Sequence, residues 1–189
     1  MRGGVWRAGL AFGLLGLLGC GQGAPAPAYD DGRGFSFTPP PGWVERVREG
    51  AAASPRSRQG HALPLPPLDG PGLPAQAHLL ARYDRVTAGR LAWLRLAAAD
   101  VPASTPLSAF LRPPGEGWRR EGAEEQLEVS GQPAARASFL GRWDGQEYRC
   151  ETTAVRRSAR VYAITASFPA GDSEARGQVR AAVAGVVWR

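Results

Sequence analysis

Two cysteines and two histidines are the side chains of this 189-residue chain best suited to nucleophilic, acid–base or metal chemistry. A thiol becomes a nucleophile when its pKa is lowered, and a histidine can serve as its base. Cys150 lies in an alternating run, on the same side as Tyr148 and Ala154. We therefore expect a buried thiol that packs as a small apolar side chain, and a reactive thiol is the alternative.

His61 and His78 both border a proline-rich stretch and are not spaced as a metal-binding pair. A zinc site needs three or four convergent ligands. Asp30-Asp31 and Glu124-Glu125 could offer oxygen ligands to calcium, but neither pair lies in a loop of alternating ligands with glycine. No Gly-x-Ser-x-Gly elbow, phosphate loop or dinucleotide fingerprint occurs. We expect no catalytic residue, no metal site and no cofactor.

The N-terminus has the pattern of a secretion signal, in which Arg2 and Arg7 precede an apolar run over Ala8–Leu18. This run is too short for a membrane-spanning helix, which needs roughly 20 apolar residues. It ends in Leu17-Leu18-Gly19-Cys20, which resembles the lipobox of bacterial lipoprotein signals. The resemblance implies cleavage before Cys20 and attachment of lipid to its thiol. An ordinary cleaved signal is the alternative.

These features divide the chain into a signal peptide (residues 1–19), a lipidated cysteine with a Gly/Ala/Pro tether (20–28) and one domain (29–189). A proline- and glycine-rich insertion occupies residues 49–77 of the domain. With Cys20 acylated, Cys150 has no disulfide partner, so the domain must be stabilised by its own core. We expect an extracytoplasmic protein anchored to the cell membrane or to the periplasmic side of the outer membrane.

The charge of the chain gives little support to nucleic-acid binding. Removal of residues 1–19 lowers the formal net charge from +6 to +4, because Arg2 and Arg7 leave with the signal peptide. The remaining arginines are scattered among acidic residues and form no basic stripe. We expect a membrane and an envelope protein as partners, and no nucleic acid.

Alternating apolar residues predict most of the secondary structure. Residues 34–38 and a strand from Trp43 to Arg48 are expected to form an N-terminal hairpin. Further strands are predicted at 78–85, 90–97, 134–143, 146–155 and 160–168, with a short one at 127–129. Asp144-Gly145 is a strong hairpin signal.

Two helices are predicted. Thr105 is the expected N-cap of a short helix that begins at Pro106 and turns Leu107, Phe110 and Leu111 to one side. Asp172 or Ser173 is expected to cap a C-terminal amphipathic helix, whose apolar stripe consists of Ala175, Val179, Ala182, Val183 and Val186. An antiparallel meander covered by helices is an α+β domain.

The opening Gly34-Phe35-Ser36-Phe37-Thr38-Pro39-Pro40-Pro41-Gly42-Trp43 resembles that of the PsbP-like family, which includes DcrB-type bacterial lipoproteins. The strand at Tyr162–Ala166 and the final helix resemble the family's ending. The resemblance implies an α/β/α sandwich around a mainly antiparallel sheet, and a binding or assembly role without catalysis. The large insertion departs from the family, and no metal-binding or partner-binding position can be transferred.

Aromatic and arginine side chains are favoured at protein interfaces. We select Trp43, Trp143, Arg156 and Arg157 as possible interface residues, with core packing as the alternative for the tryptophans and a solvated turn for the arginines. The expected function is a non-catalytic binding or assembly role of a membrane-anchored envelope lipoprotein. A carrier of a small molecule or calcium is the alternative, and a hydrolase that uses His61 or His78 is a weaker one.

Overall fold

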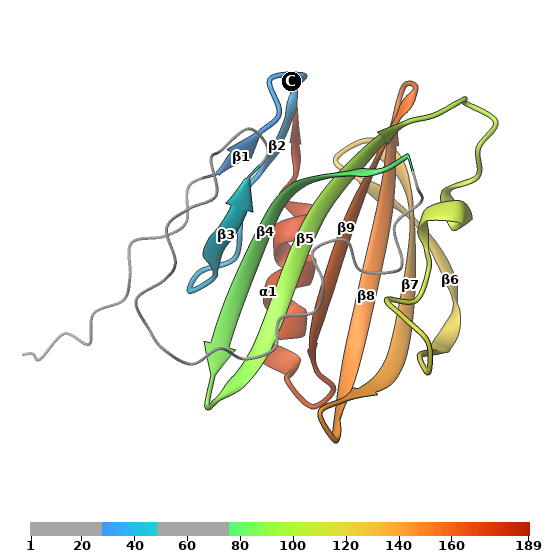
Figure 1. The fold of residues 1–189 in the computed structure, drawn as a ribbon. Helices are drawn as coiled ribbons and strands as arrows, with labels where there is room; N and C mark the ends of the chain where they lie inside the picture. Colours follow the sequence, from blue (N-terminus) through green and yellow to red (C-terminus); the bar gives the residue numbers. More distant parts are fainter. Residues whose placement is uncertain (1–27, 49–75) are drawn as a thin grey trace, which may run out of the picture.

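A computed structural model describes residues 28–48 and 76–189 as two antiparallel sheets and one α-helix (Figure 1). The larger sheet has the strand order β3-β4-β5-β9-β8-β7-β6, and the smaller has the order β1-β2-β10. The strands of the larger sheet, in that order, are Val44–Arg48, His78–Thr87, Arg90–Asp100, Arg160–Pro169, Gln146–Arg157, Gln132–Trp143 and Arg119–Val129. Those of the smaller sheet are Tyr29–Asp30, Phe35–Phe37 and Val187–Trp188. The α+β fold class is confirmed.

Tight turns join most neighbouring strands of the larger sheet. Asp144 and Gly145 have φ angles of 49° and 74°, as a type I′ turn between β7 and β8 requires. Ala88 and Gly89 have positive φ between β4 and β5 in the same way. The two hairpins predicted at these positions are therefore confirmed, and β9 follows β8 as expected.

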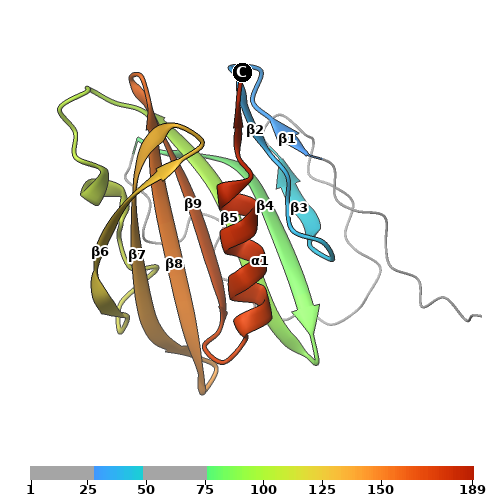
Figure 2. The ribbon, with the colours of Figure 1, turned by 180° about the vertical axis from the view of Figure 1, so that it is seen from behind.

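Helix α1 (Ser173–Ala184) covers one face of the larger sheet (Figure 2). Asp172 caps it, because its Oδ1 accepts a hydrogen bond of 2.8 Å from the N–H of Ala175. The buried side chains of the helix, Ala175, Val179 and Val183, pack with inward residues of the sheet. The predicted helix, its cap and most of its apolar stripe are confirmed, although Val186 lies just beyond the helix end.

The opposite face of the sheet has a thinner cover. Phe110 and Leu111, at the end of the 3₁₀ turn η1 (Leu107–Phe110), pack against apolar side chains of β7 and β8 such as Phe139 and Cys150. Within residues 28–48 and 76–189, α1 is the only α-helix, so this side has a single 3₁₀ turn where a sandwich would have a helical layer.

Two local predictions were wrong. Residues 34–38 and β3 do not form a hairpin: β2 pairs with β1 and β10, while β3 pairs with β4. The prolines at 39–41 separate the two strands and send them to different sheets. Thr105 makes no cap, because the expected helix is one 3₁₀ turn whose N-cap position is Pro106. The strand expected at 127–129 is confirmed, as the end of the longer edge strand β6.

Several expectations concern residues that the structure does not describe. The signal peptide, the lipobox, Cys20 and nearly all of the tether lie within residues 1–27, and His61 and most of the insertion lie within 49–75. These predictions remain untested. No helix of the described residues is long and apolar enough to cross a membrane.

Glu151 fastens α1 to the sheet. Its side chain is 3% exposed on β8 and accepts hydrogen bonds of 2.7 Å from Nε of Arg176 and 2.9 Å from both Nε and Nη2 of Arg180. Ser138 on β7 donates a further bond of 3.3 Å. Burial alone would raise the pKa of this carboxyl, but the bonds from Arg180 and Arg176 outweigh it and hold the pKa below its usual value.

Replacing the carboxylate, Glu151→Gln, should lower the free energy of unfolding by about 2 kcal/mol, because two charge-assisted contacts to half-exposed arginines are lost. Urea unfolding at neutral pH measures this change. Glu147→Gln on the same strand is the matched control and should change stability by less than about 0.5 kcal/mol, because Glu147 is exposed.

The hydrogen bonds that Glu151 accepts from Arg176 and Arg180 also make the stability of the fold depend on pH. A carboxyl whose pKa is lower in the folded state stabilises the fold above its unfolded pKa, and this stability is lost as the pH falls. The wild type should therefore lose stability as the pH falls below about 4.5, and Glu151→Gln should lose less over that range. Parallel pH profiles for the two proteins would contradict the assignment.

Candidate functional site

Cys150 is a free thiol buried between the sheet and η1. Its side chain is fully buried, and burial raises its pKa to about 12, an effect that the nearby Arg95 only partly offsets. A thiol with this pKa is protonated at neutral pH and is a poor nucleophile. The prediction of a buried Cys150 that packs as an apolar side chain is confirmed.

His78 lies at the start of β4, where its Nε2 is 3.1 Å from Nη2 of Arg160. Arg160 is held in turn by both carboxylate oxygens of Asp100, each at 3.2 Å. His78 thus belongs to an arginine–carboxylate network. No group of three His, Cys, Asp or Glu side chains among the described residues could hold a metal ion.

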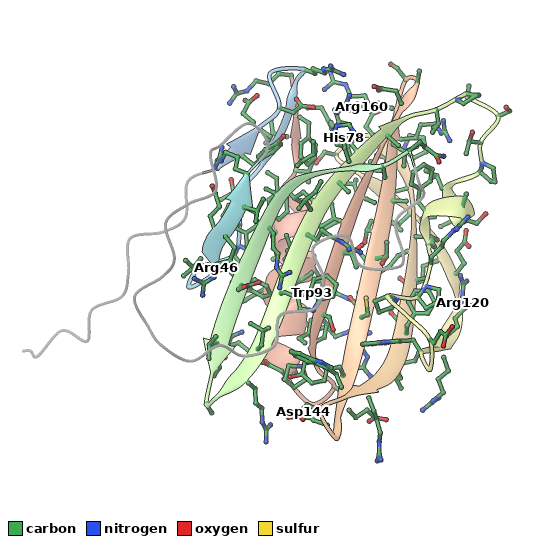
Figure 3. The ribbon with its side chains drawn as sticks, viewed as in Figure 1. Arg46, His78, Trp93, Arg120, Asp144 and Arg160 are labelled. Atoms are coloured by element: carbon green, nitrogen blue, oxygen red, sulfur yellow. The ribbon has the colours of Figure 1, made fainter. Side chains whose placement is uncertain are left out.

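A polar cleft of about 340 Å³ surrounds His78 at the end of the domain where the described chain begins (Figure 3). We call it the His78 cleft. It is lined by Tyr29, Asp30, Asp31, Arg33, Arg48, His78 and Arg160. Strand β1, the turn after it, and the ends of β3, β4 and β9 together supply these side chains.

Asp31 lines the His78 cleft and holds the turn after β1 through its hydrogen bonds. Its Oδ1 accepts the N–H groups of Arg33 and Phe35 at 2.7 and 3.0 Å, and its Oδ2 accepts the Tyr162 hydroxyl at 2.6 Å. Burial would raise the pKa of Asp31, but these three bonds outweigh it and lower the pKa below its usual value. Asp31 is therefore an ionised acceptor that fixes the turn, and not a general acid.

The charges around the His78 cleft are largely paired. Arg48 bonds to Glu45 at 2.6 Å and lies over the ring of Tyr29, 5.4 Å from its centroid. Arg33 lies 3.6 Å from Asp100, and both of these side chains are about 65% exposed. Exposed pairs of this kind are weak and can be exchanged for the charges of a partner. The cleft is thus suited to polar binding.

The structure places the four predicted interface residues in different regions. Trp43 is 1% exposed, and its indole N–H bonds to Oε1 of Gln178 on α1 at 3.0 Å, so its ring offers no surface to a partner here. Trp143 is half-buried at the far end of the sheet, where it packs edge-on against Tyr148.

Arg156 and Arg157 hold parts of the domain together. Arg157 donates to the backbone oxygens of Gly34, at 2.8 Å, and of Arg189, and it lies over the ring of Trp188. Arg156 donates to the backbone oxygen of Thr105 before η1. The structure does not bring the four residues into one surface, and an interface role for any of them remains a prediction.

Two buried arginines on the sheet face opposite α1 were not predicted from the sequence. Arg82 on β4 and Arg95 on β5 are opposite each other in the strand register, and both are buried. Trp93 lies on the same face, which is the one seen in Figure 3. The signal was present in the sequence: Arg95 interrupts a strand in which every residue from Leu91 to Ala99 is otherwise apolar.

The two arginines differ in their partners. Nε of Arg82 is 3.0 Å from Oδ1 of Asp84, whose other oxygen is 3.3 Å from Nε of Arg46. Arg95 has no carboxylate partner among the described residues, and its buried Nε has no hydrogen-bond partner. Burial, together with the charge of Arg82, lowers the pKa of Arg95.

The chain resembles known proteins in its three-dimensional structure. No family model and no curated protein matches the chain. The cyanobacterial PsbP (CyanoP) of Synechocystis sp. PCC 6803 is 12% identical with a TM-score of 0.52, over 92% of this chain and 99% of that protein. A Bacteroides thetaiotaomicron VPI-5482 protein has 12% identity and a TM-score of 0.51, over 88% of this chain and 49% of its own.

A third structure is more distant. LpqN of Mycobacterium tuberculosis, described as involved in cell envelope biogenesis, is 12% identical with a TM-score of 0.42, over 63% of this chain and 82% of that protein. The alignment with CyanoP spans nearly both chains and agrees with the sheet and helix described above. The chain therefore has a PsbP-like α+β fold.

Proposed function

We propose that this chain is a lipid-anchored extracytoplasmic protein with a non-catalytic binding or assembly role in the cell envelope. The observation that carries the proposal is the placement of Leu17-Leu18-Gly19-Cys20 directly before the PsbP-like domain. Acylation of Cys20, with further acylation of the new amino group, would hold the protein stably at a membrane, because two or more chains anchor where one does so only marginally.

The anchor would place a particular end of the domain near the membrane. From Cys20 to Tyr29 the chain spans at most about 30 Å when fully extended. Strand β1 begins at Tyr29, and the His78 cleft adjoins it. The C-terminus lies at the same end, because β10 pairs with β2 (Figure 1). The His78 cleft is therefore the described site closest to the anchor in the sequence.

A binding role agrees with the chemistry of this cleft. Its arginines and carboxylates are paired with one another, its histidine contacts an arginine, and the thiol of Cys150 is buried elsewhere. The exposed pair Arg33–Asp100 at its rim can exchange partners with a charged segment of an envelope protein. Small-molecule binding is the second candidate, which the buried Arg95 favours.

Cys20→Ala tests the anchor. We expect the variant to leave the membrane fraction and to run without lipid, because the acylated atom is the thiol sulfur. Fractionation with mass spectrometry of the N-terminal peptide measures this, and Cys150→Ala is the matched control that keeps the lipid. A Cys20→Ala protein that stays with the membrane would contradict the proposal.

A photo-crosslinking residue at Arg33 tests the contact surface. Arg33 is exposed at the rim of the cleft, so we expect a defined protein adduct in cells that weakens when Cys20→Ala is added. The same residue at Arg142, exposed near the opposite end of the sheet, is the control and should give no adduct. Equal adducts at the two positions, or none at Arg33, would count against a partner at this cleft.

A further inference from the structure

Arg95 is a nearly buried cation at the middle of the face opposite α1. It is 5% exposed and lies in β5, with β4 on one side and β9 on the other. A guanidinium keeps its proton under all ordinary conditions, so it cannot avoid the cost of burial by becoming neutral. Burying an unpaired charge costs several kcal/mol unless a counter-charge or hydrogen bonds offset it.

Among residues 28–48 and 76–189, the buried groups on this face include one more cation than anion. Asp84 is buried and is bonded to Arg82, and Arg46, which also contacts Asp84, is partly exposed to solvent. The other buried side chains that share the face on β5, β8 and β9 are apolar, hydroxyl or thiol groups, and Arg156 at the end of β8 is only partly buried. Arg95 therefore has no counter-charge among the described residues.

Neutral hydrogen-bond donors lie beside Arg95. Thr165 on β9 is opposite Arg95 in the register, and Thr152 on β8 is opposite Thr165. The Thr152 hydroxyl donates to Oγ1 of Thr165 at 3.2 Å, which leaves the Thr165 hydroxyl hydrogen for another acceptor. Ser167, opposite Trp93, adds another buried hydroxyl.

Trp93 supplies an apolar surface next to these donors. The centroid of its ring is 5.4 Å from Cζ of Arg95 and 6.0 Å from Cζ of Arg82. Cation–π contact of this kind orients a guanidinium but adds no negative charge. The Nε of Arg95 remains without a hydrogen-bond partner.

We infer that Arg95 is the anchor of a binding site for a small monoanionic carboxylate, with Thr165 as a neighbouring donor and Trp93 as its apolar wall. The planar fork of arginine matches the two oxygens of a carboxylate. The described residues leave one buried positive charge without a counter-charge, which favours a carboxylate with one negative charge over a phosphate that carries nearly two. The site is independent of the membrane anchor and of the His78 cleft.

Thermal unfolding of the full chain tests the site with sodium acetate and sodium benzoate as probes, at ionic strength held constant with sodium chloride. We expect the wild-type midpoint to rise with carboxylate concentration and to saturate. Arg95→Met should bind at least tenfold more weakly, and without carboxylate it should be at least as stable as the wild type, because it removes a buried unpaired charge. Arg142→Met, which removes an exposed arginine, should respond as the wild type does.

Arg95→Lys is a second variant, which keeps the positive charge but lacks the planar guanidinium with its two parallel N–H donors. It tests the carboxylate site if Arg95→Met does not fold. It should also bind carboxylate more weakly than the wild type. No saturable shift in the wild type with either acid would overturn the inference, as would equal shifts in the wild type and the Arg95 variants. A larger shift with inorganic phosphate at matched ionic strength would overturn the choice of a monoanion.

Discussion

The attachment of α1 to one face of the larger sheet is the interaction on which the rest of the domain depends. Val179 and Val183 of the helix bury apolar surface against the sheet. Glu151 fixes the position of the helix, because it accepts hydrogen bonds from Arg176 and Arg180. A buried carboxylate tolerates little displacement of its partners, because an unpaired charge in the interior is costly. The helix therefore has one position on the sheet, and its end leads directly into β10, which joins the smaller sheet.

The two faces of the larger sheet differ in whether their buried charged side chains have partners of opposite charge. On the helix face, Glu151 has two arginine partners and a pKa below its usual value. On the other face, Arg95 is buried beside Trp93 and hydroxyl groups without a carboxylate among the described residues. The first arrangement is complete among the described residues, whereas the second has no carboxylate partner among them. This contrast separates the face that stabilises the domain from the face that can take a ligand.

Local patterns in the sequence predicted the parts of the fold that depend on near neighbours. Alternation and the Asp144-Gly145 turn identified the hairpins, and Asp172 with the spacing of Ala175, Val179 and Val183 identified α1. The pairing of β2 with β10 joins residues about 150 positions apart, so no local pattern could predict it. The charged β6 lacks alternation because it is an edge strand. Arg95 was not selected, although it interrupts an apolar strand, because the sequence alone does not show that the face it lies on is buried.

Anomalous diffraction from crystals of the protein soaked in 4-bromobenzoate, an unreactive analogue of benzoate, would test the carboxylate site most directly, because bromine marks the position of the ligand independently of any change in stability. We expect a bromine peak on the face opposite α1, with the carboxylate within hydrogen-bond distance of the Arg95 guanidinium, and no such peak in Arg95→Met crystals. A peak only in the His78 cleft, or no peak at Arg95 at a concentration that saturates the thermal shift, would contradict this expectation.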